Sequence, residues 1–267
     1  MKLVKSERLP ASFCGADVKL SVEGAFRIVE DMVTEHMGDL KIDGVTCMRE
    51  YGGMWVFVRN RIEMLQALAW MEEYTAECYI SSFTKIRLYI DTVLRKKDGS
   101  VAVASRLELC ALDLETGKIR KAATVGVGEK TPPQEPAGDV HEVVYSKVKL
   151  LKGAKLDEVK VGASDIDYCY HTNNISYVRY FMNQFSVDDL VERPVSAIEV
   201  QYVNQTHEGD RLEVYACEPA ADKSDDVAAQ STQSGGAAED YSTQAAYTEA
   251  YMIELDGKQV VSCQIVR

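Results

Sequence analysis

The sequence predicts an α+β protein that consists of two consecutive copies of one unit, each a helix followed by an antiparallel sheet. Each half of the 267-residue chain has one apolar stripe at helical spacing, followed by short β-rich segments separated by turn residues. Between them lies a break that contains three of the six prolines, which neither a helix nor a central strand accommodates. We therefore expect units at residues 1–127 and 144–267, joined by a linker at 128–143.

The first half is expected to contain one helix and four strands. In residues 21–38 apolar side chains recur every three or four positions, which is typical of a helix with one buried face. The segment that begins at Trp55 has high β propensity, and Asp98-Gly99 is a strong hairpin signal. Residues 65–77 fit either a helix or a loop. We expect the four strands to follow one another as a meander at residues 54–64, 84–94, 101–109 and 119–127.

The second half repeats this order, with a helix that begins at Asn174. Residues 218–244 are rich in Ala, Ser, Gln, Gly and Asp and contain almost no large aliphatic side chain, so we expect a disordered insertion there at a hairpin tip. Alignment of the two halves sets this insertion against the Asp98-Gly99 hairpin, and it sets Asp256-Gly257 against Thr116-Gly117. The strands are expected at residues 144–151, 197–205, 211–217, 246–255 and 259–266.

Composition and charge exclude several classes of protein. No run of about 18 apolar residues occurs, so we expect no membrane span, and the charged N-terminus lacks the apolar region of a secretory signal. The formal net charge of −12 disfavours binding to nucleic acid. The seven cysteines are scattered without a C-x-x-C pair, which argues against a disulfide framework or a zinc site and favours a cytoplasmic location. Phosphate-binding and dinucleotide-binding motifs are also absent, so we expect no cofactor and no metal.

The densest group of chemically active side chains lies just before the second helix. Within residues 165–171, two carboxylates and a thiol accompany one of the four histidines. Asn173 and Asn174 are good helix N-caps, because their side-chain oxygens can accept hydrogen bonds from the first backbone N–H groups. One face of the helix that follows is apolar and is expected to be buried. The polar cluster is therefore expected on a loop that is held rigidly at the entrance to a buried helix.

Residues 165–177, Asp-Ile-Asp-Tyr-Cys-Tyr-His-Thr-Asn-Asn-Ile-Ser-Tyr, resemble the motif D-x-D-x-N-x-H-V-N-N-x-x-Y of the acyl-[acyl carrier protein] thioesterases of plants and bacteria. In the first half, residues 54–64 and 107–127 resemble segments of the same family. The resemblance extends over nearly the whole chain outside residues 218–244. It implies a double hotdog fold, in which each hotdog unit is a helix wrapped by a curved antiparallel sheet and the two sheets are able to pair edge to edge.

The resemblance also implies an activity, namely hydrolysis of the thioester of acyl-acyl carrier protein, which releases a free fatty acid and terminates chain elongation. The family's motif aspartate and histidine fall on Asp167 and His171. The family's asparagine falls on Cys169 and its glutamate on Gln205, so two positions depart from the family pattern. The first half lacks D-x-x-x-H-x-N-N, so we expect it to supply the pocket for the acyl chain and no catalytic group.

Hydrolysis of a thioester needs an activated nucleophile and donors aimed at the developing oxyanion. His171 is the natural base for a water molecule, with Asp167 fixing its tautomer, and Gln205 could orient that water or donate to the oxyanion. A thiolate of Cys169 is an alternative nucleophile. We favour water, because residues two apart in an extended segment lie about 6 to 7 Å apart, too far for activation by His171 without a bend. His207 could replace the missing base, although a histidine at a strand end is usually only solvated.

Further residues are candidates for binding the substrate or its carrier. By family analogy, Ile28 and Met32 would line the acyl-chain tunnel. Acyl carrier protein is acidic, so basic side chains would form its docking surface. An acyl-CoA thioesterase and a non-catalytic binder of the acyl carrier stay open as alternatives, as do a monomer and a homodimer. The other substrate-binding candidates are Asn173, Asn174, Trp55 and Arg59. The basic candidates are Arg59, Arg61, Lys85, Arg87, Arg95, Lys96 and Lys97.

Overall fold

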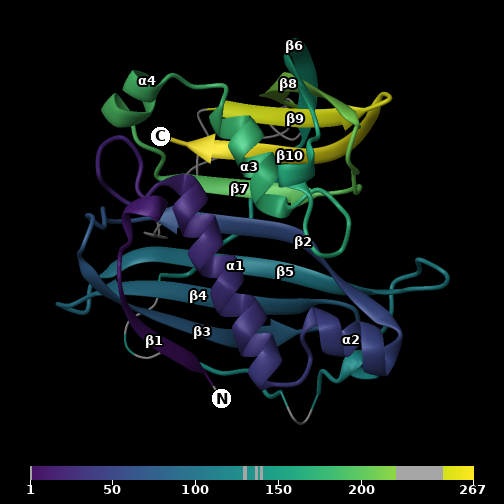
Figure 1. The fold of residues 1–267 in the computed structure, drawn as a ribbon. Helices are drawn as coiled ribbons and strands as arrows, with labels where there is room; N and C mark the ends of the chain where they lie inside the picture. The colour runs from purple at the N-terminus through teal and green to yellow at the C-terminus, as the bar shows by residue number, and fades with distance from the viewer. Residues whose placement is uncertain (1, 129–130, 136–137, 139–140, 221–248) are drawn as a thin grey trace, which may run out of the picture.

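The computed structural model describes residues 2–128, 131–135, 138, 141–220 and 249–267. Within these residues, ten strands form one sheet in the order β1-β3-β4-β5-β2-β7-β10-β9-β8-β6 (Figure 1). The first half contributes β1 (Leu3–Arg8), β2 (Gly53–Met64), β3 (Glu73–Phe83), β4 (Leu88–Lys96) and β5 (Val101–Asp113). The second half contributes β6 (Leu150–Lys160), β7 (Ala197–Tyr202), β8 (Arg211–Pro219), β9 (Glu249–Leu255) and β10 (Lys258–Val266).

The two halves of the sheet have the same strand order. Counted outward from the centre, β2-β5-β4-β3-β1 in the first half corresponds to β7-β10-β9-β8-β6 in the second. The halves join where β2 pairs antiparallel with β7, from Arg59 opposite Gln201 to Glu63 opposite Ala197. The structure therefore confirms an α+β fold of two helix-and-sheet units whose sheets pair edge to edge.

One helix that follows a capped loop packs on the sheet in each half. α1 (Val22–Asp39) begins at Ser21, and α3 (Asn174–Met182) begins at Asn173; each of these cap side chains accepts a backbone N–H of its helix. Figure 1 shows both helices on the same side of the sheet, and their apolar faces are buried in one continuous core. None of the helices among the described residues is both long enough and apolar enough to cross a membrane.

Two short helices and two strands, β1 and β3, were not predicted from the sequence. α2 (Gly44–Tyr51) follows α1 and is capped by Asp43, whose carboxylate accepts two backbone N–H groups of the helix. α4 (Val187–Glu192) follows α3. With eight and six residues, these helices are too short to show a clear apolar period. The edge strand β1 leaves most of its side chains exposed, so its sequence shows no clear alternation of apolar and polar residues.

The predicted strand at residues 119–127 is wrong. Its first residue makes a single bridge to Leu112, and Ala122–Val125 form a short 3₁₀ helix. The reason lies in packing, because Val125 is fully buried in a small cluster with Cys47 of α2 and Ala111 of β5. This segment therefore covers α2 instead of extending the sheet.

The strand predicted at residues 144–151 begins only with β6. Just before β6, the hydroxyl of Tyr145 donates to the carbonyl oxygen of Arg106 at 3.0 Å. The backbone N–H of Ser146 donates to the carboxylate of Glu199 at 2.8 Å. These contacts tie the chain to β5 and β7 as it passes from one half to the other, and they replace the strand pairing that the prediction assumed.

The predicted alignment of turns between the halves is also wrong. Asp98-Gly99 joins β4 to β5, so its counterpart is Asp256-Gly257, which joins β9 to β10. The expected insertion falls between β8 and β9, where the first half has the connection from β3 to β4. Because β8 extends to Pro219, the insertion does not begin at 218. Its residues 221–244 lie outside the described part of the chain.

The strand order of the first half differs from the predicted meander. Only β3, β4 and β5 follow one another, whereas β2 lies between β5 and β7. β3 also begins at Glu73, inside the segment that fitted either a helix or a loop. Short-range patterns predict that strands exist, but pairing between distant segments decides their order.

The loops that lead into α1 and α3 share one backbone structure. In the first loop, Gly15 N–H donates to the carbonyl oxygen of Lys19 at 2.8 Å, and in the second, Asp167 N–H donates to that of His171 at 3.0 Å. A residue with positive φ lies at the same position of both loops, with values of 62° and 63°. The loops therefore correspond residue by residue, with Lys19 in the place of His171 and Gly15 in the place of Asp167.

Candidate active site

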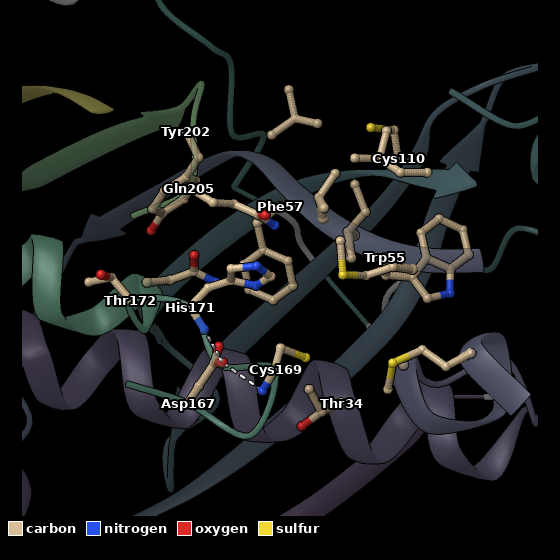
Figure 2. A pocket seen from close by; sticks show the side chains of 18 of the residues that line it. Thr34, Trp55, Phe57, Cys110, Asp167, Cys169, His171, Thr172, Tyr202 and Gln205 are labelled. Carbon is tan, nitrogen blue, oxygen red and sulfur yellow. Dashed lines mark hydrogen bonds between the residues drawn. The ribbon is translucent and has the colours of Figure 1, made fainter. Parts of the chain in front are cut away.

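A cavity of about 490 Å³ is lined by residues of both halves. The first half contributes side chains of α1, α2, β2 and β5, and the second contributes the loop before α3 and the segment after β7. Figure 2 shows His171 and Gln205 at one end of this cavity and Trp55 and Cys110 at the other. One end is thus polar and comes from the second half, while the other is mainly apolar and comes from the first.

The two aspartates of the loop before α3 have different partners. The Asp165 carboxylate accepts the backbone N–H of Gly162 at 2.9 Å and forms an ion pair with Arg179 of α3. Its carbonyl oxygen accepts the N–H of Asn173 at 2.7 Å. Asp165 is only 7% exposed and does not line the cavity, so it anchors the loop to the helix.

Asp167 lines the cavity and organises the loop from inside. Its Oδ1 accepts the backbone N–H of Cys169 at 2.8 Å and that of His171 at 3.4 Å (Figure 2). Among the described residues, no hydrogen bond joins this carboxylate to the imidazole of His171. Asp167 therefore holds the backbone of His171, and its charge acts on the ring through space.

The imidazole of His171 faces the cavity and lies against a second histidine. The ring centroids of His171 and His207 are 5.1 Å apart, with the planes at 67°. Burial lowers the pKa of His171 and the neighbouring His207 lowers it further, while the charge of Asp167 opposes both effects. His171 is therefore neutral at neutral pH and can accept a proton.

Cys169 lines the same cavity but is a poor source of thiolate. Burial raises the pKa of its thiol, and the negative charge of Asp167 raises it further, with a partial offset from Tyr168. Among the described residues no hydrogen bond links its sulfur to His171. The thiol therefore stays protonated at neutral pH, unlike an activated cysteine nucleophile.

A chain of buried hydroxyl groups holds the two segments of the polar end together. Thr172 Oγ1 lies 2.6 Å from Thr206 Oγ1, which lies 2.7 Å from the hydroxyl of Tyr177. The N–H of Thr172 also donates to the carbonyl oxygen of Thr206 at 2.8 Å. Because Thr172 follows His171 and Thr206 follows Gln205, this clamp fixes both cavity-lining residues relative to each other. Sequence reasoning missed it, since the two threonines are separated by 34 residues.

The substrate-binding candidates of the second half separate into two roles. Asn174, the first residue of α3, lines the cavity, as His171 and Gln205 do. Asn173 does not line it, and its Oδ1 accepts the N–H of Ile175 at 2.8 Å. Asn173 is therefore a helix cap, as its sequence position suggested, and Asn174 is available to a ligand.

Of the substrate-binding candidates in the first half, some line the cavity and others do not. Trp55 lines the cavity, and its indole N–H donates to the carbonyl oxygen of Ile42 at 2.7 Å. Ile28 and Met32, each 5% exposed, are core residues that do not border the cavity. Thr34 and Met37 of α1 line it instead. Helical periodicity identified the buried face of α1 but not the part of it that meets the cavity.

Arg59 lies outside the cavity, at the join between the halves. Its guanidinium forms an ion pair with Glu199 and lies 4.8 Å from the ring centroid of Tyr145. Arg61 pairs with Glu63 at 2.7 Å and with the same Glu199 at 3.5 Å. These arginines connect β2 to β7 and are not placed to contact a ligand in the cavity.

Comparisons with known proteins identify the family. The N-terminal domain model of the acyl-ACP thioesterases matches residues 8–124, and the C-terminal domain model matches residues 148–265. No curated protein sequence matched significantly.

Three solved structures are similar over 99% of this chain. They are an acyl-ACP thioesterase from Bacteroides thetaiotaomicron (15% identity, 97% of that chain, TM-score 0.74), a putative oleoyl thioesterase from Lactobacillus plantarum (16%, 95%, 0.71) and the 12:0-ACP thioesterase of Umbellularia californica (15%, 96%, 0.69). At this identity they support the double hotdog fold, and the family models cover most of the sequence. The chain therefore belongs to the acyl-ACP thioesterase family and is a thioester hydrolase that acts on acyl-acyl carrier protein.

Proposed function

We propose that the chain cleaves acyl-acyl carrier protein at the polar end of the cavity, by attack of water on the thioester carbonyl. The observation that carries this proposal is the neutral imidazole of His171, clamped at the end of a cavity whose other end is apolar. A base that is neutral at working pH can take a proton from water. An apolar compartment beside it suits an acyl chain. The products are a free fatty acid and the thiol of the carrier.

His171 acts first as a base and then as an acid in this mechanism. It accepts a proton from the attacking water, and a tetrahedral intermediate forms on the thioester carbon. The side-chain amides of Gln205 and Asn174, both in the cavity wall, are the candidate donors to the oxyanion, and Asn174 also lies at the positive end of α3. The imidazolium then returns its proton to the departing thiolate. Asp167 positions the backbone of His171 and stabilises the imidazolium through its charge.

Attack by Cys169 is the less favoured route. A covalent mechanism requires a thiolate, whereas the raised pKa of Cys169 keeps the thiol protonated. The sulfur also lacks a hydrogen bond to His171 within the described residues. We therefore propose that Cys169 fills the position of the family's asparagine without forming an acyl-enzyme.

The first half is proposed to hold the acyl chain and to carry out no chemistry. Its loop before α1 has Lys19 where the second half has His171, and Gly15 where it has Asp167. Trp55 and Met48 contribute to the cavity wall on the side of α2. A single catalytic end and a single chain-holding end follow from this asymmetry, and the chain-holding part falls within residues 1–127.

For the carrier, we propose a docking surface beside Arg87 and Ile119, which line the cavity. Arg59 and Arg61 are occupied by ion pairs at the join between the halves, and Arg87 pairs with Glu108 at 2.7 Å. The backbone N–H of Ala122 donates to the carbonyl oxygen of Lys85 at 2.9 Å, which brings two exposed lysine-bearing segments together. The exposed lysines of this surface are Lys85, Lys118 and Lys121.

Such a surface favours an acidic carrier protein over coenzyme A, because it extends beyond the reach of a small thiol. We also propose that the protein works in the cytoplasm, where reducing conditions would preserve its thiols; all seven cysteines are free in the structure.

Hydrolysis assays with a panel of acyl carrier proteins and acyl-CoAs test the proposal. Wild type should hydrolyse acyl-carrier substrates, and His171→Ala should lose at least about a hundredfold in kcat/KM. Reversing the charge of Lys85, Lys118 and Lys121 should raise KM for the carrier substrate but not for acyl-CoA. Reversal of three exposed lysines near and on β6, Lys147, Lys149 and Lys160, serves as the matched control.

Each alternative has its own outcome in this assay. Equal effects of the lysine reversal on both substrates would remove the argument for the carrier. If the wild type binds acyl carriers but hydrolyses none, the chain is a non-catalytic binder. Full activity of His171→Ala would overturn the mechanism.

A further inference from the structure

His207 is a second histidine that lies against His171, a residue of the cavity wall. It lies in the turn after β7, and its ring packs edge to face on the ring of His171 at a centroid distance of 5.1 Å. Its backbone N–H donates to the carboxylate of Asp210 at 2.8 Å, and the N–H of Asp210 donates back to the carbonyl oxygen of His207 at 3.2 Å. The turn thus holds the second ring in place against the first.

The backbone of this turn does not require a histidine. The corresponding turn of the first half has Ala69, whose N–H donates to the carboxylate of Glu72 at 2.9 Å, and Glu72 N–H donates back at 3.0 Å. Ala69 bridges to Lys19, the counterpart of His171. The same turn therefore forms with the small side chain of alanine at this position, so the imidazole of His207 is not needed for the turn itself.

We propose that His207 is a positioning residue that keeps His171 in its neutral form by excluding a second positive charge from the histidine pair. This inference rests on the proposed function, in which His171 is the base. Two imidazolium rings at this distance repel each other. His171 is partly buried, and burial together with the neighbouring charge of His207 lowers its pKa, so His171 stays neutral.

Other titratable groups surround the two histidines. Asp167 favours a proton on His171, and Asp43 at the start of α2 lines the same cavity. Glu30 of α1 interacts with Asp167. Glu208 and Asp210 lie in the turn of His207 itself, where the Asp210 carboxylate accepts the backbone N–H of His207. Of the other titratable groups of the loop, Tyr168 and Cys169 have raised pKa values and are neutral near pH 7. Asp165 pairs with Arg179, and Tyr170 is exposed.

The pair would serve both steps of the reaction. A neutral His171 can accept a proton from water at lower pH than an isolated histidine. Once protonated beside His207, it is also a stronger acid, which favours return of the proton to a departing thiolate whose own pKa is about 8.5. Neither effect requires His207 to touch the substrate.

The test is an NMR titration of the four histidines in wild type, His207→Gln and His171→Gln. Loss of His207 should move the titration of His171 to higher pH, because the charge of the neighbouring ring no longer lowers the pKa of His171. His171→Gln identifies the signal of His171. The signals of His36 and His141 serve as controls in the same samples and should not move. Unchanged titration of His171 in His207→Gln would overturn the proposal.

Kinetics supply the second readout. The acid limb of kcat/KM in His207→Gln should move to higher pH, with a relative loss of about threefold near pH 5.5, while the plateau above pH 8 changes by less than about twofold. If kcat/KM of His207→Gln falls at all pH values and its acid limb stays at the wild-type pH, His207 has a structural role, and the inference is contradicted. Because the NMR titration needs no turnover, it tests the pair even if the proposed hydrolysis fails.

Discussion

The carboxylate of Asp167 accepts a hydrogen bond from the backbone N–H of Cys169 at 2.8 Å. The corresponding loop of the first half is built differently, because Asp17 supplies the carboxylate there and accepts the N–H of Lys19 at 3.3 Å, while Gly15 occupies the position of Asp167. The loop therefore needs an acceptor, but it does not need one at this position. The structural and electrostatic contributions of Asp167 can be separated by substitution.

Asp167→Asn should keep the loop and lose the charge. Its amide oxygen can still accept the N–H of Cys169, so we expect the melting temperature to change by no more than about 2 °C. kcat/KM should fall by about 10- to 100-fold, because the imidazolium loses the stabilising charge of Asp167.

The pH profile of this variant gives the sign of the charge effect. Asp167 raises the pKa of His171, so the acid limb should move to lower pH in Asp167→Asn, opposite to the shift expected for His207→Gln. Asp167→Ala, which also removes the acceptor, serves as the comparison and should cost about a further 1 kcal/mol of stability. An acid limb that moves upward in Asp167→Asn would contradict the assigned role.

Cys169→Ala should retain most of the hydrolytic activity. The raised pKa of this thiol also predicts slow alkylation by iodoacetamide at pH 7, where the thiolate is scarce, and faster alkylation only at alkaline pH. Mass spectrometry of protein quenched during turnover should reveal no acyl adduct on Cys169. Cys14, another partly buried cysteine, is the reference thiol for the alkylation rate. Loss of activity in Cys169→Ala together with a trapped adduct would establish the covalent route instead.

The parts of the fold that the sequence predicted well are those specified by local patterns. The period of α1, the β propensity around Trp55 and the Asp98-Gly99 hairpin each depend on residues close together in the chain, and the structure contains all three elements. The polar end of the site could be predicted from the sequence for the same reason, since Asp167 and His171 lie on one loop. Short helices and strand order depend on distant contacts, which a single sequence does not specify.

Distant contacts that the sequence does not specify also decide the position of single residues in the site. Arg59 looked available to a ligand because nothing local pairs with it, but its partner Glu199 is 140 residues away. His207 is exposed, as its position at a strand end suggested, but the clamp between Thr172 and Thr206 also holds its turn near His171. Distances along the chain therefore predicted which groups could act, and tertiary packing decided which of them meet.

Substitutions of Met48 should change the acyl-chain preference in opposite directions. Met48 of α2 lines the cavity, and Trp55 packs on the cluster that contains its neighbour Cys47. Met48→Ala should favour longer chains and Met48→Trp shorter ones, by about fourfold in kcat/KM per methylene group, since each buried methylene contributes about 0.8 kcal/mol. The measurement is kcat/KM over a series of chain lengths. Val187→Ala, on the exposed surface of α4, is the control, and a shift in the same direction for both Met48 variants would rule out this end of the cavity as the length determinant.

Glu30 of α1 is a partly buried carboxylate. Its Oε1 has no hydrogen-bond partner within the described residues, and burial, followed by the charges of Asp31 and Asp167, raises its pKa to about 8. A carboxylic acid that stays protonated in the folded protein but ionises in the unfolded chain destabilises the fold as pH rises. Below about pH 4.5 both states are protonated and the effect vanishes.

Glu30→Gln should therefore stabilise the protein in a pH-dependent way. The gain should be near zero at pH 4, grow between pH 4.5 and 8, and level off above pH 8 at a few kcal/mol, with about 5 kcal/mol as the upper bound for a shift of this size. Partial exposure of the side chain reduces that bound. Urea unfolding at pH 4, 6 and 8.5 measures the gain. Glu35→Gln on the same helix, which removes an ion pair with Lys5 at the surface, should change stability by less than about 1 kcal/mol at all three values. If Glu30→Gln is no more stable than wild type at pH 8.5, the carboxyl is not held in its protonated form.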